Sequence, residues 1–148
     1  MKIREIENND LERWSEMRTS LWPKTDDAHL AEIKAFFDGI SIDVEQVYVA
    51  IIDETAVGFI ELNIREFAEG SRRPKVPYVE AWYVDSEYRG RGYGKQLMLR
   101  AEKWAIDQGF NELASDTEID NHISIAMHTH LGFKETERVV CFLKQLTT

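Results

Sequence analysis

The chain has 148 residues, of which 43% are hydrophobic, so it is long enough for one domain with a buried core. Its 27 acidic and 18 basic residues give a net charge of −9, which argues against a nucleic-acid partner because a phosphate backbone needs a basic face. The same charge suits a cationic ligand, although solubility alone is an equally good reason for it.

The single cysteine, Cys141, excludes an internal disulfide and indicates a reducing, cytoplasmic location. Its place in an apolar run predicts that it packs in the interior. No apolar stretch has the length of a signal peptide or a membrane span, so we expect no membrane contact. Repeats and linkers are not evident, which predicts a single domain over residues 1–148.

Hydrophobic spacing divides the chain into strands and helices. Apolar residues at intervals of three and four predict helices, and β-branched or aromatic runs predict strands. The expected strands are 2–6, 45–53, 56–64, 78–84, 112–117 and 137–146, and the expected helices are 9–22, 26–39, 94–109 and a short one between Asn121 and Gly132. This order predicts an α/β (α+β) domain with a mixed, mainly antiparallel sheet, and not a doubly wound nucleotide fold, whose strands and helices alternate regularly.

The strand at 78–84 has apolar residues on both faces, so it is expected at the centre of the sheet. Strict alternation puts Tyr78, Glu80 and Trp82 on one face. A carboxylate in the middle of such a strand is costly unless it is paired or used, which makes Glu80 a candidate for function. The helix at 94–109 is expected to bury a broad apolar side made of Leu97, Leu99, Ala101, Trp104 and Ala105.

A basic, glycine-spaced turn joins this strand to this helix, DSEYRGRGYGK at 85–95. Glycines let the backbone approach a ligand, and a helix N-terminus offers unpaired N–H groups, so the turn is suited to a pyrophosphate. The turn does not fit the Walker A or dinucleotide patterns, because no Gly-Lys-Ser/Thr is present and the glycine spacing differs. The expected contacts are Arg89, Gly90, Arg91, Gly92, Tyr93, Gly94 and Lys95.

The pattern Arg89-x-x-Gly92-x-Gly94 resembles the loop with which the GNAT superfamily of N-acetyltransferases holds the pyrophosphate of acetyl-CoA. Downstream, NHISIAMHTHLGF resembles the superfamily's Asn-x-x-Ala/Ser…Tyr-x-x-x-Gly-Phe segment. The resemblance implies acetyl-CoA as cosubstrate. We expect no metal, because the four histidines form no metal-binding set and His128 and His130 diverge on a helix. The resemblance also implies cofactor contacts from the end of the strand, Trp82, Tyr83 and Val84, and from Asn121, on the pantetheine arm.

One position departs from the superfamily pattern. Many members carry a tyrosine, thought to protonate the leaving thiolate, where this chain has His128. An imidazolium is a stronger acid than a thiol, so His128 could do the same. The alternative, that His128 only packs or hydrogen-bonds, stays open.

Four segments, SLWPKTDDAHLAEI, YVEAWYV, ELASDTEIDNHIS and GFKETERVV, are together similar to the aminoglycoside 6'-N-acetyltransferases of type I, bacterial enzymes that inactivate polycationic antibiotics. Here Phe67 stands in place of a tyrosine, which leaves only an apolar contact. Four of the substrate contacts that this resemblance implies also have a structural explanation: core packing for Trp22, an ion pair with an arginine for Glu80, a turn for Asp116 and a solvated strand end for Glu137. The substrate contacts that the resemblance implies are Trp22, Phe67, Glu80, Asp116 and Glu137.

The expected reaction is direct acyl transfer from the thioester to an amine. Glu80 is the candidate base, and a backbone N–H near Tyr83 or Val84 is the candidate donor to the oxyanion. The family resemblance and the apolar run VVCFL favour a homodimer. Two alternatives remain: an acetyltransferase of the same fold for another small amine, a polyamine or a peptide N-terminus, and a non-catalytic acetyl-CoA-binding regulatory domain.

Overall fold

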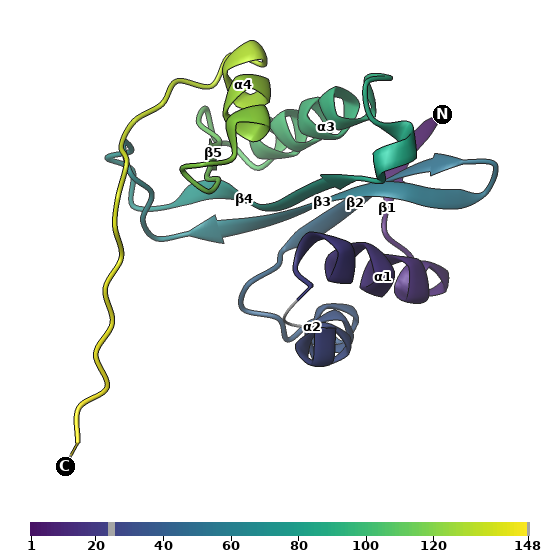
Figure 1. Ribbon diagram of the computed structural model, residues 1–148, viewed down its shortest axis with the longest axis horizontal. Coiled ribbons are helices and arrows are strands. Elements are labelled where there is room, and N and C mark those ends of the chain that lie inside the picture. The colour runs from purple at the N-terminus through teal and green to yellow at the C-terminus, as the bar shows by residue number, and fades with distance from the viewer. Residues whose placement is uncertain (24–25, 148) are drawn as a thin grey trace.

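The computed structural model describes residues 1–23 and 26–147, without the side chains of residues 26–28. Figure 1 shows the helices and strands in chain order. They are β1 (Lys2–Glu5), η1 (Asn8–Asp10), α1 (Leu11–Leu21), α2 (Asp26–Phe37), β2 (Gln46–Ile52), β3 (Thr55–Arg65), β4 (Val76–Val84), η2 (Ser86–Tyr88), α3 (Tyr93–Asp107), β5 (Ala114–Ser115) and α4 (His122–His130).

A five-stranded sheet forms the middle layer, in the order β1-β2-β3-β4-β5. Neighbouring strands are antiparallel except β4 and β5, which are parallel. Helices α3 and α4 cover one face of the sheet, and α1 and α2 cover the other (Figure 1). The predicted mixed, mainly antiparallel α/β architecture is therefore confirmed. None of the described helices has the length and apolar character needed to cross a membrane.

The sheet separates the two larger apolar cores, so both faces of β3 and β4 are buried, as predicted for β4. The middle strand of the sheet is β3, so the predicted central position of β4 is wrong by one strand. The core on the α3 side contains Ile60, Leu62, Val79, Leu97 and Met98. The core on the α1 and α2 side contains Trp14, Met17, Ile33, Phe59 and Ala81.

The apolar side of α3 is narrower than predicted. Leu97, Ala101, Trp104 and Ala105 are buried, but Leu99 is 44% exposed and Met98 is fully buried. Each residue turns a helix by about 100°, so a residue two positions after Leu97 lies on nearly the opposite side. The prediction for Leu99 is therefore wrong.

The C-terminal tail, residues 134–147, contains neither strand nor helix. It runs past the end of the sheet and away from the body of the protein (yellow in Figure 1). Val140, Phe142 and Leu143 are 77%, 91% and 89% exposed, and Cys141 is exposed as well. The predicted strand at 137–146 and the packed Cys141 are therefore wrong for the single chain. A strand needs a neighbour, and this segment pairs with no described strand of its own chain.

Candidate active site

A β-bulge at Glu80 sets the geometry of β4. In the ladder between β3 and β4, Leu62 pairs with Val79 and Glu61 pairs with Ala81. Glu80 is thus the additional residue of β4, with no partner of its own in this register. Bulges of this kind bend a strand and redirect a side chain, often beside an active site.

The bulge changes which side chains share a face. Glu80 lines a pocket on the α1 and α2 side and Ala81 packs in the core on that same side. Trp82 packs against the opposite core, beside α3. The prediction that Tyr78, Glu80 and Trp82 share one face is therefore wrong for Trp82, because one additional residue shifts the alternation by one position.

Glu80 is held by an arginine of the neighbouring strand. Arg65 donates from Nε to Oε2 at 2.7 Å and from Nη2 to Oε1 at 2.6 Å, and Asn63 Nδ2 donates to Oε2 at 3.4 Å. The guanidinium lies 3.7 Å from the centre of the Tyr78 ring, whose hydroxyl donates to Asp116 at 2.8 Å. The side chain of Glu80 is 17% exposed and that of Arg65 is 39% exposed. The arginine pair considered for Glu80 from the sequence is therefore present, at the edge of solvent.

Tyr78 and Arg65, the two hydrogen-bond donors beside Glu80 and Asp116, both keep their protons. Burial, together with the hydrogen bond to Asp116, raises the pKa of Tyr78 well above its usual range, so the phenol stays a donor. The hydrogen bond to Glu80 raises the pKa of Arg65, so its positive charge is permanent. One guanidinium therefore lies within the field of two carboxylates, Glu80 and Asp116.

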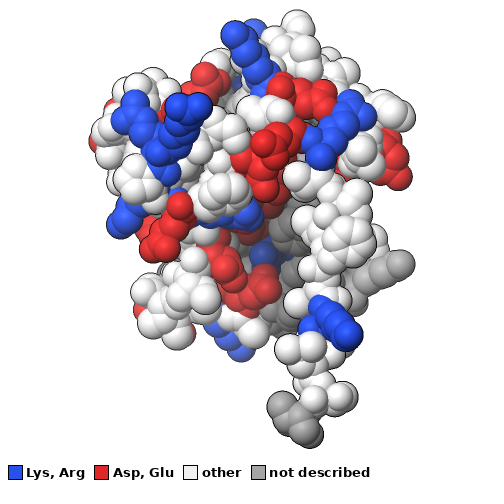
Figure 2. Space-filling view, turned by 90° about the vertical axis from the view of Figure 1, so that its left-hand side faces the viewer, with Lys and Arg blue, Asp and Glu red and all other residues white. Residues whose placement is uncertain are grey.

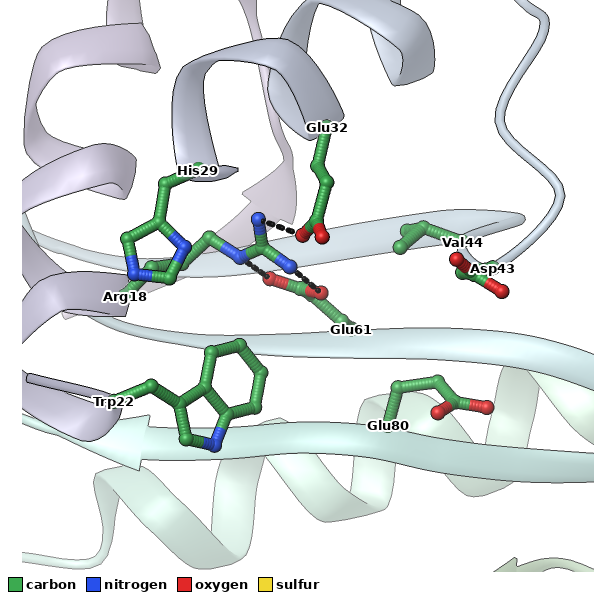
Figure 3. A pocket seen from close by; sticks show the side chains of 8 residues that line it. All are labelled: Arg18, Trp22, His29, Glu32, Asp43, Val44, Glu61 and Glu80. Atoms are coloured by element: carbon green, nitrogen blue, oxygen red, sulfur yellow. Dashed lines mark hydrogen bonds and ion pairs between the residues drawn. The ribbon is translucent and has the colours of Figure 1, made fainter. Parts of the chain in front are cut away.

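A pocket of about 330 Å³ lies between the α1 and α2 helices and the sheet. Figure 3 shows its side chains, with the Arg18 guanidinium between Glu61 and Glu32, and Glu80 on β4. Four carboxylates in one pocket make it suited to a cationic ligand. The pocket is lined by Arg18, Trp22, His29, Glu32, Asp43, Val44, Glu61 and Glu80.

A second arginine–glutamate pair forms the buried wall of this pocket. Arg18 Nε lies 2.9 Å from Glu61 Oε2 and its Nη1 lies 2.6 Å from Glu32 Oε2. The side chains of Arg18 and Glu61 are only 5% and 1% exposed. Trp14 Nε1 also donates to Glu61, at 2.9 Å. Burial raises the pKa of Glu61, and the Arg18 charge and the Trp14 hydrogen bond oppose that rise.

The surface of this face, like the pocket, is rich in acidic side chains. Figure 2 shows Asp and Glu side chains around a hollow on one face of the molecule, with Lys and Arg mostly towards the edge of the view. Trp22, a predicted contact, lines the pocket and also packs against the core beneath α1 and α2. The core packing weighed for Trp22 is therefore present, and its contact with a substrate stays a prediction.

The basic turn leads from β4 into α3 through two glycines in the left-handed region. Gly90 has φ 79° and Gly92 has φ 87°, a conformation that residues with a Cβ rarely adopt. Gly92 is the N-cap of α3, so the first N–H groups of that helix lie at the turn. The local sequence thus folds into the anion-binding geometry expected of it.

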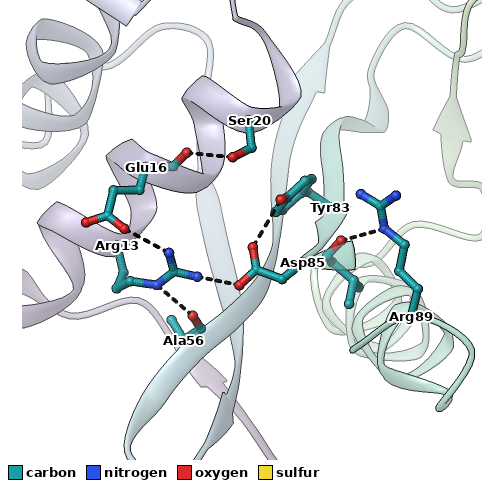
Figure 4. Close-up of polar contacts among 8 residues, drawn as sticks. Arg13, Glu16, Ser20, Ala56, Tyr83, Asp85 and Arg89 are labelled. Carbon is teal, nitrogen blue, oxygen red and sulfur yellow. Dashed lines mark hydrogen bonds and ion pairs between the residues drawn. The ribbon is translucent and has the colours of Figure 1, made fainter. Parts of the chain in front are cut away.

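Polar contacts hold the end of this turn that follows β4, as Figure 4 shows. Arg89 Nε donates to the carbonyl oxygen of Val84 at 2.7 Å, which folds the turn back onto β4. Asp85 accepts from the Tyr83 hydroxyl at 3.0 Å and from Arg13 Nη2 at 2.6 Å. These hydrogen bonds therefore connect the turn to α1 and to the end of β4.

The sheet opens beside the turn. β4 and β5 pair only at Tyr78–Ala114 and Val79–Ser115, so the predicted strand at 112–117 is confirmed for two residues alone. From Glu80 to Val84, no described strand pairs with β4 on this side. Backbone groups along an unpaired edge need other partners, and a ligand can supply them.

His128 of α4 is positioned at this opening. Its Nε2 lies 2.8 Å from Ser115 Oγ, and its Nδ1 lies 2.8 Å from the carbonyl oxygen of Ser124. A carbonyl only accepts, so Nδ1 carries the proton, and in the neutral ring Nε2 accepts from the Ser115 hydroxyl. The ring meets Trp82 edge-on, with 5.1 Å between the ring centres. Asn121 caps the same helix, with Oδ1 accepting from Ser124 N at 3.1 Å.

Two predicted contacts lie apart from this arrangement. Phe67 lies in the loop between β3 and β4 and is 67% exposed, and Glu137 is an exposed residue of the tail. Neither belongs to the lining of the pocket. Among the described residues, no three His, Cys, Asp or Glu side chains form a group that could hold a metal ion.

Sequence reasoning missed the partners of the two strand carboxylates. Glu61 interrupts the apolar run AVGFIELNI in the same way that Glu80 interrupts YVEAWYV, so a signal for it was present. Arg18 and Arg65 carried no comparable signal, because an arginine near a strand end or in a helix is usually solvated.

Comparison with known proteins adds a family to this geometry. Residues 8–133 match the model of the acetyltransferase (GNAT) family. The chain belongs to the GNAT family. The resemblance inferred from the glycine turn is thereby confirmed, and GNAT enzymes use acetyl-CoA as cosubstrate.

This GNAT chain is 37% identical over 147 residues to aminoglycoside N(6')-acetyltransferase type 1 of Salmonella enteritidis, covering 98% of the chain and 99% of the relative. It superposes with a TM-score of 0.89, at 34% identity, on the aminoglycoside antibiotic 6'-N-acetyltransferase AAC(6')-IG from Acinetobacter haemolyticus, covering 99% and 100% of the two chains. AAC(6')-Iy in complex with the bisubstrate analogue CoA-S-monomethyl-acetylneamine gives 0.88 at 36% identity, covering 98% of each chain.

Proposed function

We propose that this GNAT chain is an aminoglycoside 6'-N-acetyltransferase, which confers antibiotic resistance by moving an acetyl group from acetyl-CoA to the 6' amine. The observation that carries this proposal is the pocket of four carboxylates that ends at Glu80, where the sheet opens towards the glycine turn. A polycationic acceptor complements the pocket, and a polyanionic donor complements the turn. The position of the acetylated amine follows from the relatives.

The donor half of the site combines the turn with the open edge of β4. We assign the pyrophosphate to the N–H groups of residues 89–95, with Arg89, Arg91 and Lys95 adding positive charge. The pantetheine arm then follows Trp82, Tyr83 and Val84, where no described strand pairs with β4. Asn121 contributes its side-chain amide from the start of α4.

The acceptor half combines the pocket with the Tyr78–Asp116 pair. Trp22 forms an apolar wall against a sugar ring, and Glu80 and Asp116 bind ammonium groups. Phe67 and Glu137 lie outside the pocket lining, and we assign to them contacts with parts of the acceptor that extend beyond it.

The chemistry requires a free amine and a place for the oxyanion. The ammonium gives a proton to Glu80, directly or through water, and the amine nitrogen attacks the thioester carbonyl carbon. A backbone N–H near Tyr83 or Val84 donates to the oxyanion. As the C–N bond forms, the C–S bond breaks, and the thiolate takes a proton from His128 or from solvent.

The substrate class is tested by measuring CoA release with tobramycin, with an aminoglycoside that carries a hydroxyl at the 6' position, and with spermidine. We expect turnover with tobramycin alone, and NMR of the product should place the acetyl group on the 6' nitrogen. Turnover with spermidine only, or with no amine, contradicts the proposal.

The role of Glu80 is tested by replacing it with glutamine. A lost general base lowers kcat/KM by about 10²- to 10⁴-fold and removes the corresponding limb of the pH profile. Glu54→Gln is the matched control, because Glu54 is an exposed residue of the β2–β3 turn. An unchanged kcat/KM and pH profile for Glu80→Gln would remove Glu80 from catalysis.

We propose further that the protein is a cytoplasmic homodimer. The tail presents Val140, Phe142 and Leu143 to solvent, and an extended apolar segment of this kind favours pairing with another chain. Each copy carries the same tail, so a two-fold pair covers both. The free thiol of Cys141 in this tail suits a reducing compartment.

Sedimentation equilibrium tests the assembly. We expect twice the mass of one chain for the wild type and the mass of one chain for Phe142→Asp combined with Leu143→Asp. Ile106→Asp is the control, because Ile106 is an exposed apolar residue of α3, 67% accessible, outside the tail. A monomeric wild type, or a dimeric tail variant, contradicts this assignment.

A further inference from the structure

The ion pair between Arg65 and Glu80 occupies the carboxylate that the proposed function assigns to the acceptor. Both oxygens of Glu80 accept from the guanidinium, at 2.6 and 2.7 Å. A second cation at Glu80 would therefore lie beside a permanent positive charge. An acceptor ammonium must overcome this repulsion or take the place of the guanidinium.

Arg65 has the properties of a cation that can be displaced. It is the last residue of β3, and its side chain is 39% exposed, against 5% for Arg18, the arginine of the buried wall. Arg18 is fixed by two carboxylates, whereas Arg65 is fixed by Glu80 and by its contact with the Tyr78 ring. Ion pairs and cation–π contacts of half-exposed groups are weak enough for a multivalent ligand to replace.

The displaced charge would remain close to an anion. Asp116, which accepts from the Tyr78 hydroxyl, acts on Arg65 electrostatically already. A carboxylate has about four lone-pair positions, so Asp116 can accept from Arg65 beside the Tyr78 hydroxyl and an acceptor ammonium. Rotation of Arg65 away from Glu80 thus exchanges one carboxylate for another and does not leave the guanidinium without a counter-charge.

We propose that Arg65 is a specificity-determining residue: its guanidinium is an internal cation that an acceptor ammonium replaces on Glu80. This inference rests on the proposed function, because it takes Glu80 as an acceptor contact. A singly charged amine gains one ion pair at Glu80 and disrupts another, so its net gain is small. An acceptor with several ammonium groups also gains contact with another pocket carboxylate, Asp43, so the exchange favours it.

Replacing Arg65 tests the exchange. Arg65→Gln should lower KM for tobramycin by about five-fold, because the competing cation is gone. Arg65→Lys, which keeps the charge and loses the two-pronged contact, should lie between that variant and the wild type. Arg72→Gln, which removes an exposed charge from the loop between β3 and β4, should leave KM unchanged. A raised or unchanged KM for Arg65→Gln overturns the proposal, and a raised one would show that Arg65 orients Glu80 for the acceptor.

Calorimetric titration of tobramycin into each enzyme with CoA separates this proposal from the proposed function. Tighter binding by Arg65→Gln without turnover in any form would support the exchange and refute the acetyltransferase assignment. Turnover with equal or weaker binding by the variant would support the assignment and refute the exchange. Neither binding nor turnover by the wild type refutes both. Thermal unfolding of each variant confirms that the comparison is made between folded proteins.

Discussion

Two arginine–glutamate pairs, whose glutamates lie on the adjacent strands β3 and β4, have opposite characters. Arg18 and Glu61 lie in the interior, 5% and 1% exposed, and Glu32 and Trp14 complete their contacts. Arg65 and Glu80, the bulge residue of β4, are 39% and 17% exposed. An arginine–glutamate ion pair thus supports the fold where both side chains are buried. Where the arginine can leave, the glutamate becomes available to a ligand.

The largest effect is expected at the buried pair. Arg18→Met leaves Glu61 in the interior without its counter-charge, which should lower the free energy of unfolding by about 3–5 kcal/mol. Urea denaturation measures the loss. Arg18→Met combined with Glu61→Met should recover much of it, because both charges are then removed together. A loss near that of an exposed ion pair would show that the Arg18–Glu61 pair is not structural.

The same variant should change the pH dependence of stability. Burial raises the pKa of Glu61, and without Arg18 only the Trp14 hydrogen bond remains of the two contacts that oppose that rise. The folded state then holds a proton that the unfolded state has released, so stability falls as the pH increases from the unfolded value of about 4.3 to the raised folded value. Arg18→Met should therefore regain up to about 1.4 kcal/mol for each pH unit of acidification within that window. Equal pH dependence of the variant and the wild type in thermal unfolding would contradict this account of Glu61.

The smallest effect on stability is expected at the partly exposed pair, Arg65 and Glu80. Arg65→Gln should lower the free energy of unfolding by only about 0.2–1 kcal/mol, since solvent screens a half-exposed ion pair. Urea denaturation under the same conditions gives the comparison. A loss as large as that of Arg18→Met would mean that Arg65 supports the fold and cannot be exchanged for a ligand.

Much of the fold and of the donor site could be predicted from the sequence. The glycine turn is defined by local spacing, and Gly90 and Gly92 adopt the backbone conformation that only glycine favours. Asn121 likewise caps its helix through a contact only three residues away. Features formed by residues that are close together in the sequence can therefore be predicted from the sequence.

The acceptor site could be predicted only in part, because its geometry depends on pairing between distant segments. Glu80 was identified as an unusual carboxylate, but a bulge looks the same as regular alternation in the sequence, so the face of Trp82 was misassigned. The tail has the apolar pattern of a strand, but whether it forms one depends on a neighbour that the single chain does not supply. Arg65 meets Glu80 through β3–β4 pairing, which only the fold determines.

The exchange at Glu80 is tested most directly by a double-mutant cycle on the tobramycin dissociation constant with Arg65→Gln, Glu80→Gln and the double variant. If Arg65 competes for Glu80, Arg65→Gln tightens binding when Glu80 is present and has a much smaller effect in the Glu80→Gln background. The two substitutions should therefore be strongly coupled. Additive effects would show that Arg65 acts only as a distant charge, and would contradict the account.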